Sequence, residues 1–102
     1  MAARVRNLPL LVEPADPDAD AYTVLATAPD FMRWEEATGR SLNQLLTDER
    51  MSDRVSLAYF AAKRAGLETV ADYKNARRWA DTEVAWVDVA DEEDDPPTRA
   101  GP

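Results

Sequence analysis

The chain has 102 residues, a length that fits one small domain with a modest hydrophobic core. It contains no His and no Cys, which removes the usual general base, the thiolate nucleophile and the soft metal ligands, and so argues against most enzyme classes. The formal charge of −8 disfavours binding to nucleic acid phosphates or anionic membranes, and no apolar run approaches the roughly 18 residues that cross a bilayer.

The first part of the chain predicts two strands joined by a turn. Residues Arg4 to Glu13 (RVRNLPLLVE) alternate loosely and are rich in Val and Leu, and Pro9 within them predicts either an edge strand or the start of a strand, because proline has no N–H for a neighbour. Pro14 to Asp20 (PADPDAD) has the composition of a tight turn. Ala21 to Thr27 (AYTVLAT) is rich in β-branched and aromatic residues, so we expect a β-hairpin at the N-terminus.

Two short helical segments are predicted next. Pro29 suits the first turn of a helix because its missing N–H has no intrahelical partner there, and Gly39 suits the position after the last turn. Ser41 then caps a second segment, in which the leucines within 42–46 form an i, i+3, i+4 stripe.

A longer helix is predicted from a cap at Ser52 to about Ala65, with Gly66 as its stop. One face of this helix is apolar and comprises Val55, Ala58, Tyr59 and Ala62. Thr69 opens a further predicted helix through Arg78, so we expect three to four short helices packed as a small bundle.

The C-terminal part divides into an apolar segment and an acidic segment. Residues 83–89 fit either a short strand or a continuing helix, and we favour the strand because Val and Trp alternate there. Residues 91–102 (DEEDDPPTRAGP) contain no large apolar side chain, which predicts a disordered acidic tail. The sequence therefore predicts an α+β domain over residues 1–90, with a short N-terminal β-hairpin followed by the helices.

The aromatic residues are the strongest candidates for core and binding positions. Five of them fall in the predicted helices and are expected to build the core, namely Phe31, Trp34, Tyr59, Phe60 and Tyr73. Trp79 and Trp86 flank the point where the body gives way to the acidic segment, so they are either a lid on the core or candidate partner-binding residues.

The carboxylates do not predict a catalytic, cofactor or metal site. Glu35 and Glu36 are adjacent on a predicted helix and point about 100° apart, so they cannot converge on one atom. The run Asp91 to Asp95 lacks the Gly turn and the alternating ligand spacing of a calcium loop. Residues 30–80 hold nine bases and eight acids, whereas residues 81–102 hold eight acids and one base, so the acidity is expected at the C-terminal end.

The order of the segments carries a resemblance. The stretch DFMRWEEATGRSLNQLL combines an aromatic residue, a WE pair, a TG stop and a capped apolar turn, and it is followed by the helix SLAYFAAKRAG. The segment ETVADYKNARRWADTEVAWVDV and a charged C-terminal end come next. Over residues 22–89 this order resembles the tail assembly chaperones of long-tailed bacteriophages.

This resemblance implies a non-enzymatic protein of the bacterial host cytoplasm that is absent from the mature virion. Such chaperones bind the long, hydrophobic, largely helical tape measure protein and keep it soluble while tube subunits polymerise around it. Many are also made in a longer form by translational frameshifting, which implies a contact with the tail tube protein through that form. We expect a monomer or a weakly self-associating protein, and neither nucleic acid nor membrane as a partner.

Two other classes remain open. An acidic inhibitor that mimics nucleic acid requires its negative charge to be spread over a folded face, whereas the sequence gathers most of the charge near the C-terminus. A small adaptor protein would use the same helical surface without the phage client.

Overall fold

The computed structural model describes residues 7–90, so the expectations for residues 4–6 and for the acidic segment 91–102 lie outside it. The described residues form three strands and five helices, an α+β arrangement as predicted. The strands are β1 (Leu8–Pro14), β2 (Tyr22–Ala26) and β3 (Val84–Val89), and the helices are α1 (Ala28–Thr38), α2 (Leu42–Asp48), α3 (Met51–Arg64), α4 (Glu68–Ala71) and α5 (Ala76–Glu83).

The strands form one antiparallel sheet in the order β2-β1-β3. The predicted hairpin is present, with Leu10 opposite Val24, but it is only part of the sheet. β3 comes from the far end of the chain and pairs with the other side of β1, with Val12 opposite Val87. The strand favoured for residues 83–89 is therefore confirmed. The expected simple N-terminal hairpin is instead part of a three-stranded sheet, in which the last described strand pairs with the first.

Of the two positions that Pro9 predicted, the sheet edge is wrong, because β1 is the central strand, whereas Pro9 does lie near the start of its strand, directly after Leu8. Pro9 lies opposite Leu25 of β2, and its carbonyl oxygen accepts a hydrogen bond from the N–H of Ala90, 2.9 Å away, just beyond β3. The N–H and C=O of a strand residue point toward the same neighbour, so the missing N–H of Pro9 faces the place where β3 ends. No bond to β2 is lost, and proline is tolerated in the central strand.

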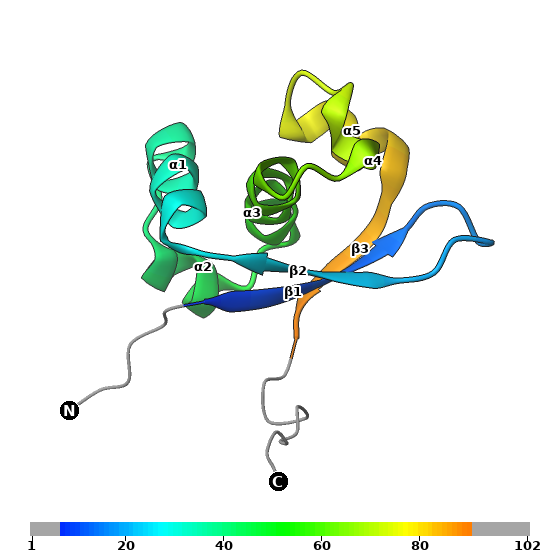
Figure 1. Ribbon diagram of the computed structural model, residues 1–102. Helices are drawn as coiled ribbons and strands as arrows, with labels where there is room; N and C mark the ends of the chain where they lie inside the picture. The colour runs from blue at the N-terminus through cyan, green and yellow to red at the C-terminus, as the bar shows by residue number, and fades with distance from the viewer. Residues whose placement is uncertain (1–6, 91–102) are drawn as a thin grey trace, which may run out of the picture.

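Helix α3 organises the core by packing across all three strands. Figure 1 shows α1 and α3 to α5 over one face of the sheet, with α2 near one end. The inward side chains of β1 are fully or almost fully buried against this layer, as the period of two along a strand requires. The predicted apolar face of α3 is confirmed, since Val55, Ala58, Tyr59 and Ala62 are all buried.

The predicted helix ends are largely confirmed by their capping geometry. Thr27 caps α1 in a capping box with Asp30, and Gly39 ends the helix in the left-handed region at φ 72°. The Ser41 hydroxyl accepts a hydrogen bond from the Gln44 N–H at 3.1 Å and so caps α2. These signals involve residues only a few positions apart, which is why the sequence reveals them.

Two helix predictions are wrong. α3 begins at Met51 with Arg50 as its cap, so Ser52 lies inside the first turn. The helix predicted from Thr69 to Arg78 is split into α4 and α5, because Asn75 adopts an extended conformation and its side chain accepts a hydrogen bond from the Arg78 N–H at 2.9 Å. An Asn that serves as a helix cap starts a new helix instead of continuing the old one.

Candidate binding surface

The side of the sheet opposite the helices is not covered by any described element (Figure 1). Because side chains alternate along a strand, the outward residues of β1 are Pro9, Leu11 and Glu13. On the flanking strands, Leu25 of β2 is 46% exposed and Trp86 of β3 is 49% exposed. The same face carries Thr23 of β2 and Asp88 of β3, which both lie opposite Leu11. Leu25 and Trp86 are exposed, whereas Pro9 and Leu11 are half-buried, and together these four apolar residues mark a candidate binding surface.

The apolar residues form a diagonal stripe across this face. Leu25 lies opposite Pro9, and Trp86 lies opposite Glu13, four residues further along β1. Leu11 lies between them and is a diagonal neighbour of both Leu25 and Trp86. From the strand rise and strand spacing, the stripe is roughly 16 Å long. We call these four residues, Pro9, Leu11, Leu25 and Trp86, the outer stripe.

The two candidate tryptophans have different environments. Trp79 is completely buried on α5, with its ring 5.8 Å from that of Tyr59, so it has no surface to present to a partner. It is a core residue, and the candidate partner role proposed for it is corrected on this ground. Its indole N–H has no hydrogen-bond partner within residues 7–90. Trp86 is exposed on the outer stripe and stays a candidate contact residue.

The other members of the outer stripe, Pro9, Leu11 and Leu25, were not predicted as binding residues. The period of two in LPLLVE placed Pro9, Leu11 and Glu13 on one side of β1, but only the structure shows that this side is open. For Trp86 a local signal existed, since it shares its side of β3 with the charged residue Asp88 and alternates with the buried Val87.

The folded chain separates charge between its two layers. Residues 7–27 and 84–90, which hold the sheet and the hairpin loop, contain five acids and no base. All nine bases of residues 7–90 belong to the helical layer, which also holds ten acids. The negative charge is thus not confined to the C-terminal end as predicted, because the sheet brings the acidic hairpin and the acidic last strand into one layer.

The free edges of the sheet are partly closed by arginines of α3. At the β2 edge, Arg64 donates a hydrogen bond to the Leu25 carbonyl oxygen at 3.2 Å. At the β3 edge, Arg54 donates to the Val87 carbonyl oxygen at 3.4 Å and forms an ion pair with Asp88 at 3.0 Å. These edge carbonyls are occupied, so the fold does not favour a partner that adds a strand there.

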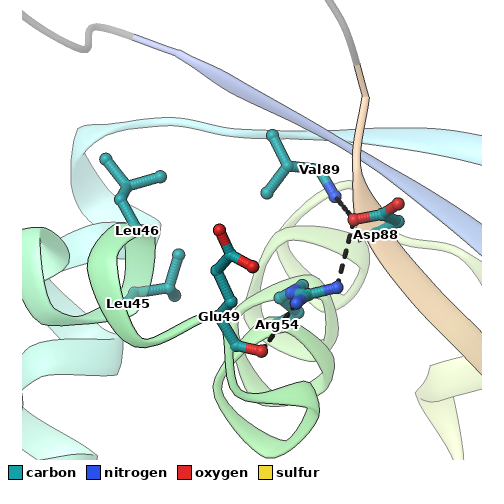
Figure 2. A pocket seen from close by; sticks show the side chains of 6 residues that line it. All are labelled: Leu45, Leu46, Glu49, Arg54, Asp88 and Val89. Carbon is teal, nitrogen blue, oxygen red and sulfur yellow. Dashed lines mark hydrogen bonds and ion pairs between the residues drawn. The ribbon is translucent and has the colours of Figure 1, made fainter.

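A cavity of about 260 Å³ lies between α2, the start of α3 and the end of β3 (Figure 2). Leu45 and Leu46 line one side of it, and Val89 lies on the other side next to the ion pair of Arg54 with Asp88. Arg54 also donates to the Glu49 carbonyl oxygen at 2.6 Å. The cation of this cavity is already engaged by the protein itself, which disfavours the cavity as an anion site.

A shallow apolar groove lies between α3 and α5. Its lining residues are Met51, Ser52, Val55, Ser56, Ala76, Arg77, Ala80 and Asp81. Arg77 and Asp81 at the rim form an ion pair with each other at 3.3 Å, so the groove has an apolar lining but little net charge. The outer stripe, in contrast, combines apolar area with an acidic surrounding.

The carboxylates of the described part of the chain do not form a cluster that could hold a metal ion. Burial raises the pKa of Tyr22, and a hydrogen bond from the Tyr73 hydroxyl to the Glu83 carboxylate, 2.9 Å long, raises the pKa of Tyr73. Both shifts keep the phenols neutral, so neither tyrosine is activated as a nucleophile.

Comparisons with known proteins do not assign a function to this surface. No protein-family model, curated protein or solved structure matches the chain. Among the described helices, none is long and apolar enough to span a membrane.

Proposed function

We propose that this protein is a tail assembly chaperone of a long-tailed bacteriophage, which binds helical apolar segments of the tape measure protein and keeps that protein soluble during tube assembly. Two observations support the proposal. Residues 22–89 resemble that family in the order of their motifs. The outer face of the sheet carries an apolar stripe, exposed at Leu25 and Trp86, that no described element covers, and a protein acting by binding requires such a surface.

The observation that carries the proposal is the outer stripe with Trp86 at one end. Its length of roughly 16 Å equals about three turns of an α-helix, so one amphipathic helical segment of the client would cover it. Tryptophan is enriched among the residues that dominate binding energies. The net charge of −8 helps to keep a complex with a hydrophobic client in solution. On this proposal the chaperone acts in the host cytoplasm and is absent from the mature virion.

The test is co-expression with the tape measure protein encoded in the same phage genome. The wild type is expected to raise the soluble fraction of the tape measure protein and to be retained with it in a pull-down. Trp86→Ala is expected to lower that retention about tenfold. Met32→Ala is the matched control, because Met32 is 60% exposed but lies on α1 in the helical layer.

Failure of the wild type to bind or to solubilise the tape measure protein would overturn the proposed function. Equal losses for the variants at Trp86 and Met32 would count against the outer stripe as the client site. Trp79→Ala does not belong in this comparison, because removing a fully buried indole costs about 3 to 5 kcal/mol of stability and confuses folding with binding.

A second candidate function is an acidic inhibitor of a nucleic-acid-binding protein, which the absence of bases from the sheet layer favours. Such a mimic would act through charge, so replacing acids of the hairpin loop would abolish inhibition and Trp86→Ala would leave it intact. The chaperone proposal expects the dominant loss from Trp86→Ala. The two candidates are separated by measuring both variants in a DNA-displacement assay and in the co-expression assay.

A further inference from the structure

The outer stripe has an acidic group directly beside its aromatic end. Trp86 and Glu13 lie opposite each other on neighbouring strands, so both side chains project from the outer face. The hairpin loop that follows Glu13 carries Asp16, Asp18 and Asp20, and Figure 1 shows it extending beyond the end of the sheet. Asp16 and Asp20 also line a hollow with Thr69 of α4 and Glu83 of α5. Neither Glu13 nor any of the three loop acids forms a salt bridge with a base among residues 7–90.

We infer that the outer face of the sheet binds a cationic amphipathic helix, whose apolar side covers the outer stripe and whose Lys or Arg residues contact Glu13 and the acids of the hairpin loop. This inference deepens the proposed function and rests on it, since it names the chemical class of the client segment. The observations behind it are the juxtaposition of Trp86 with Glu13 and the absence of any base from the strands and the hairpin loop. The arginines of α3 that reach the sheet, Arg54 and Arg64, lie at its two edges and are paired there with Asp88 and Asp30.

The geometry assigns a role to each end of the stripe. At the Leu25 end the helix contributes mainly apolar side chains, because no acid of β1 or β2 lies beside Leu25, and Asp88 of β3, which lies opposite Leu11, is already paired with Arg54 at 3.0 Å. At the Trp86 end an Arg or Lys of the client has its aliphatic stem against the indole and its charged group near the Glu13 carboxylate. The binding orientation of the helix is therefore set by charge, with its basic residues toward the hairpin loop.

Other occupants of this face are disfavoured by charge and by composition. A second copy brings another chain of net charge −8 against a layer without bases, so its approach is repulsive. The chain's own C-terminal segment, residues 91–102, has no large apolar side chain with which to cover the stripe. The N-terminal segment, residues 1–6, has two, Met1 and Val5, too few for a stripe of this length.

The test uses the full chain and two labelled helical peptides that share one apolar face. In one peptide the apolar face is flanked by Lys, and in the other by Glu. By fluorescence anisotropy at low salt, the Lys peptide is expected to bind at least about tenfold more tightly, and the preference should shrink as salt screens the charges. Unfolding curves are recorded for each protein variant, so that loss of binding is separated from loss of folding.

The variants locate the site. Trp86→Ala should weaken the Lys peptide about tenfold, and Glu13→Gln about twofold to fivefold. Combining Glu13→Gln with Asp16→Asn, Asp18→Asn and Asp20→Asn should abolish the preference for Lys over Glu. Asn at position 16 keeps the oxygen that accepts the Asp18 N–H at 2.9 Å, so the turn is preserved. Glu36→Gln is the matched control, because it removes one exposed carboxylate from α1 in the helical layer.

Each outcome decides the inference. Failure to bind the Lys peptide, equal affinity for both peptides, or binding unaffected by Trp86→Ala and Glu13→Gln would overturn it. A dimer in sedimentation that dissociates on Trp86→Ala would show that a second copy occupies the face, and would overturn it too. A tape measure protein that is bound without any charge preference leaves the proposed function standing and the inference wrong. If the peptides bind as expected but the tape measure protein does not bind, the inference stands and the proposed function is wrong.

Discussion

Replacing Asp30 with Asn tests how much a buried carboxylate contributes to this small fold. The Asp30 side chain is fully buried at the start of α1, and one of its oxygens accepts the Thr27 N–H at 2.9 Å. Its two oxygens accept from the Arg64 Nε at 2.9 and 3.0 Å, and Arg64 in turn donates to the Leu25 carbonyl oxygen. Asp30 thus joins the first turn of α1 to the end of α3 and to the β2 edge.

The expected loss lies between the limits for surface and buried ion pairs. Exposed pairs contribute about 0 to 1 kcal/mol, and breaking a fully buried pair costs about 3 to 5 kcal/mol. Arg64 is 37% exposed and can recover water, so Asp30→Asn is expected to cost about 2 kcal/mol. Arg64→Met is expected to cost more, about 3 kcal/mol, because it leaves a completely buried carboxylate without its cation.

The assay is urea denaturation followed by circular dichroism, with thermal melting as a second measurement. A loss of about 2 kcal/mol corresponds to a fall in Tm of roughly 8 to 16 °C for a domain of this size. Asp81→Asn is the matched control, since Asp81 and Arg77 form an exposed pair on α5, and it should change stability by less than about 0.5 kcal/mol. Equal effects at Asp30 and Asp81, or Arg64→Met less damaging than Asp30→Asn, would refute the reasoning from burial.

Three further predictions concern the core, the C-terminal segment and pH. Tyr59→Ala should cost about 3 kcal/mol in urea denaturation, whereas Tyr59→Phe should cost about 1 kcal/mol, because it keeps the ring and loses only the hydroxyl, which donates to the Tyr73 carbonyl oxygen (3.0 Å) and accepts from the Lys63 Nζ (3.1 Å); equal costs would contradict the packing role. Deleting residues 91–102 should leave the circular dichroism spectrum and Tm unchanged, because the last sheet bond, donated by Ala90, remains; a collapse of the signal would show that the segment is structural. In alkaline titration followed by tyrosinate absorbance, Tyr22 and Tyr73 should ionise above the ordinary pKa of about 10. The pKa of each tyrosine is higher in the folded than in the unfolded state, so its contribution to stability is complete below about pH 10 and is lost as pH rises through the folded pKa. Tyr22→Phe should therefore reduce the loss of folding stability at alkaline pH. Titration of both at the ordinary value would count against these environments.

The occupied sheet edges affect how this protein associates. Arg54 and Arg64 lie near opposite ends of α3, and each reaches a carbonyl oxygen on one edge of the sheet. An exposed edge strand is a common route to aggregation, and arginines bound to edge carbonyls oppose it. The fold therefore occupies one carbonyl oxygen on each edge of the sheet and leaves the outer face open.

The sequence by itself determined the local elements. The caps at Ser41 and Gly39, the stop at Gly66 and the apolar face of α3 all depend on residues within a few positions of one another, so local chemistry specifies them. The alternation in LPLLVE and in VAWVDV likewise gave two strands with a period of two. The break at Asn75 was equally local, but its cap was hidden inside a pattern that also fits one continuous helix.

Only the tertiary structure decided which strand is central, which tryptophan is exposed and where the negative charge gathers. Pairing of Leu10 with Val89 joins residues from opposite ends of the chain, and no local pattern encodes that closure. The closure puts Pro9 in the central strand, buries Trp79 against α3 and leaves Trp86 on the open face beside Glu13. The physical reason is that a strand's period assigns residues to two faces, while the packing of helices on one face alone decides which of them is buried.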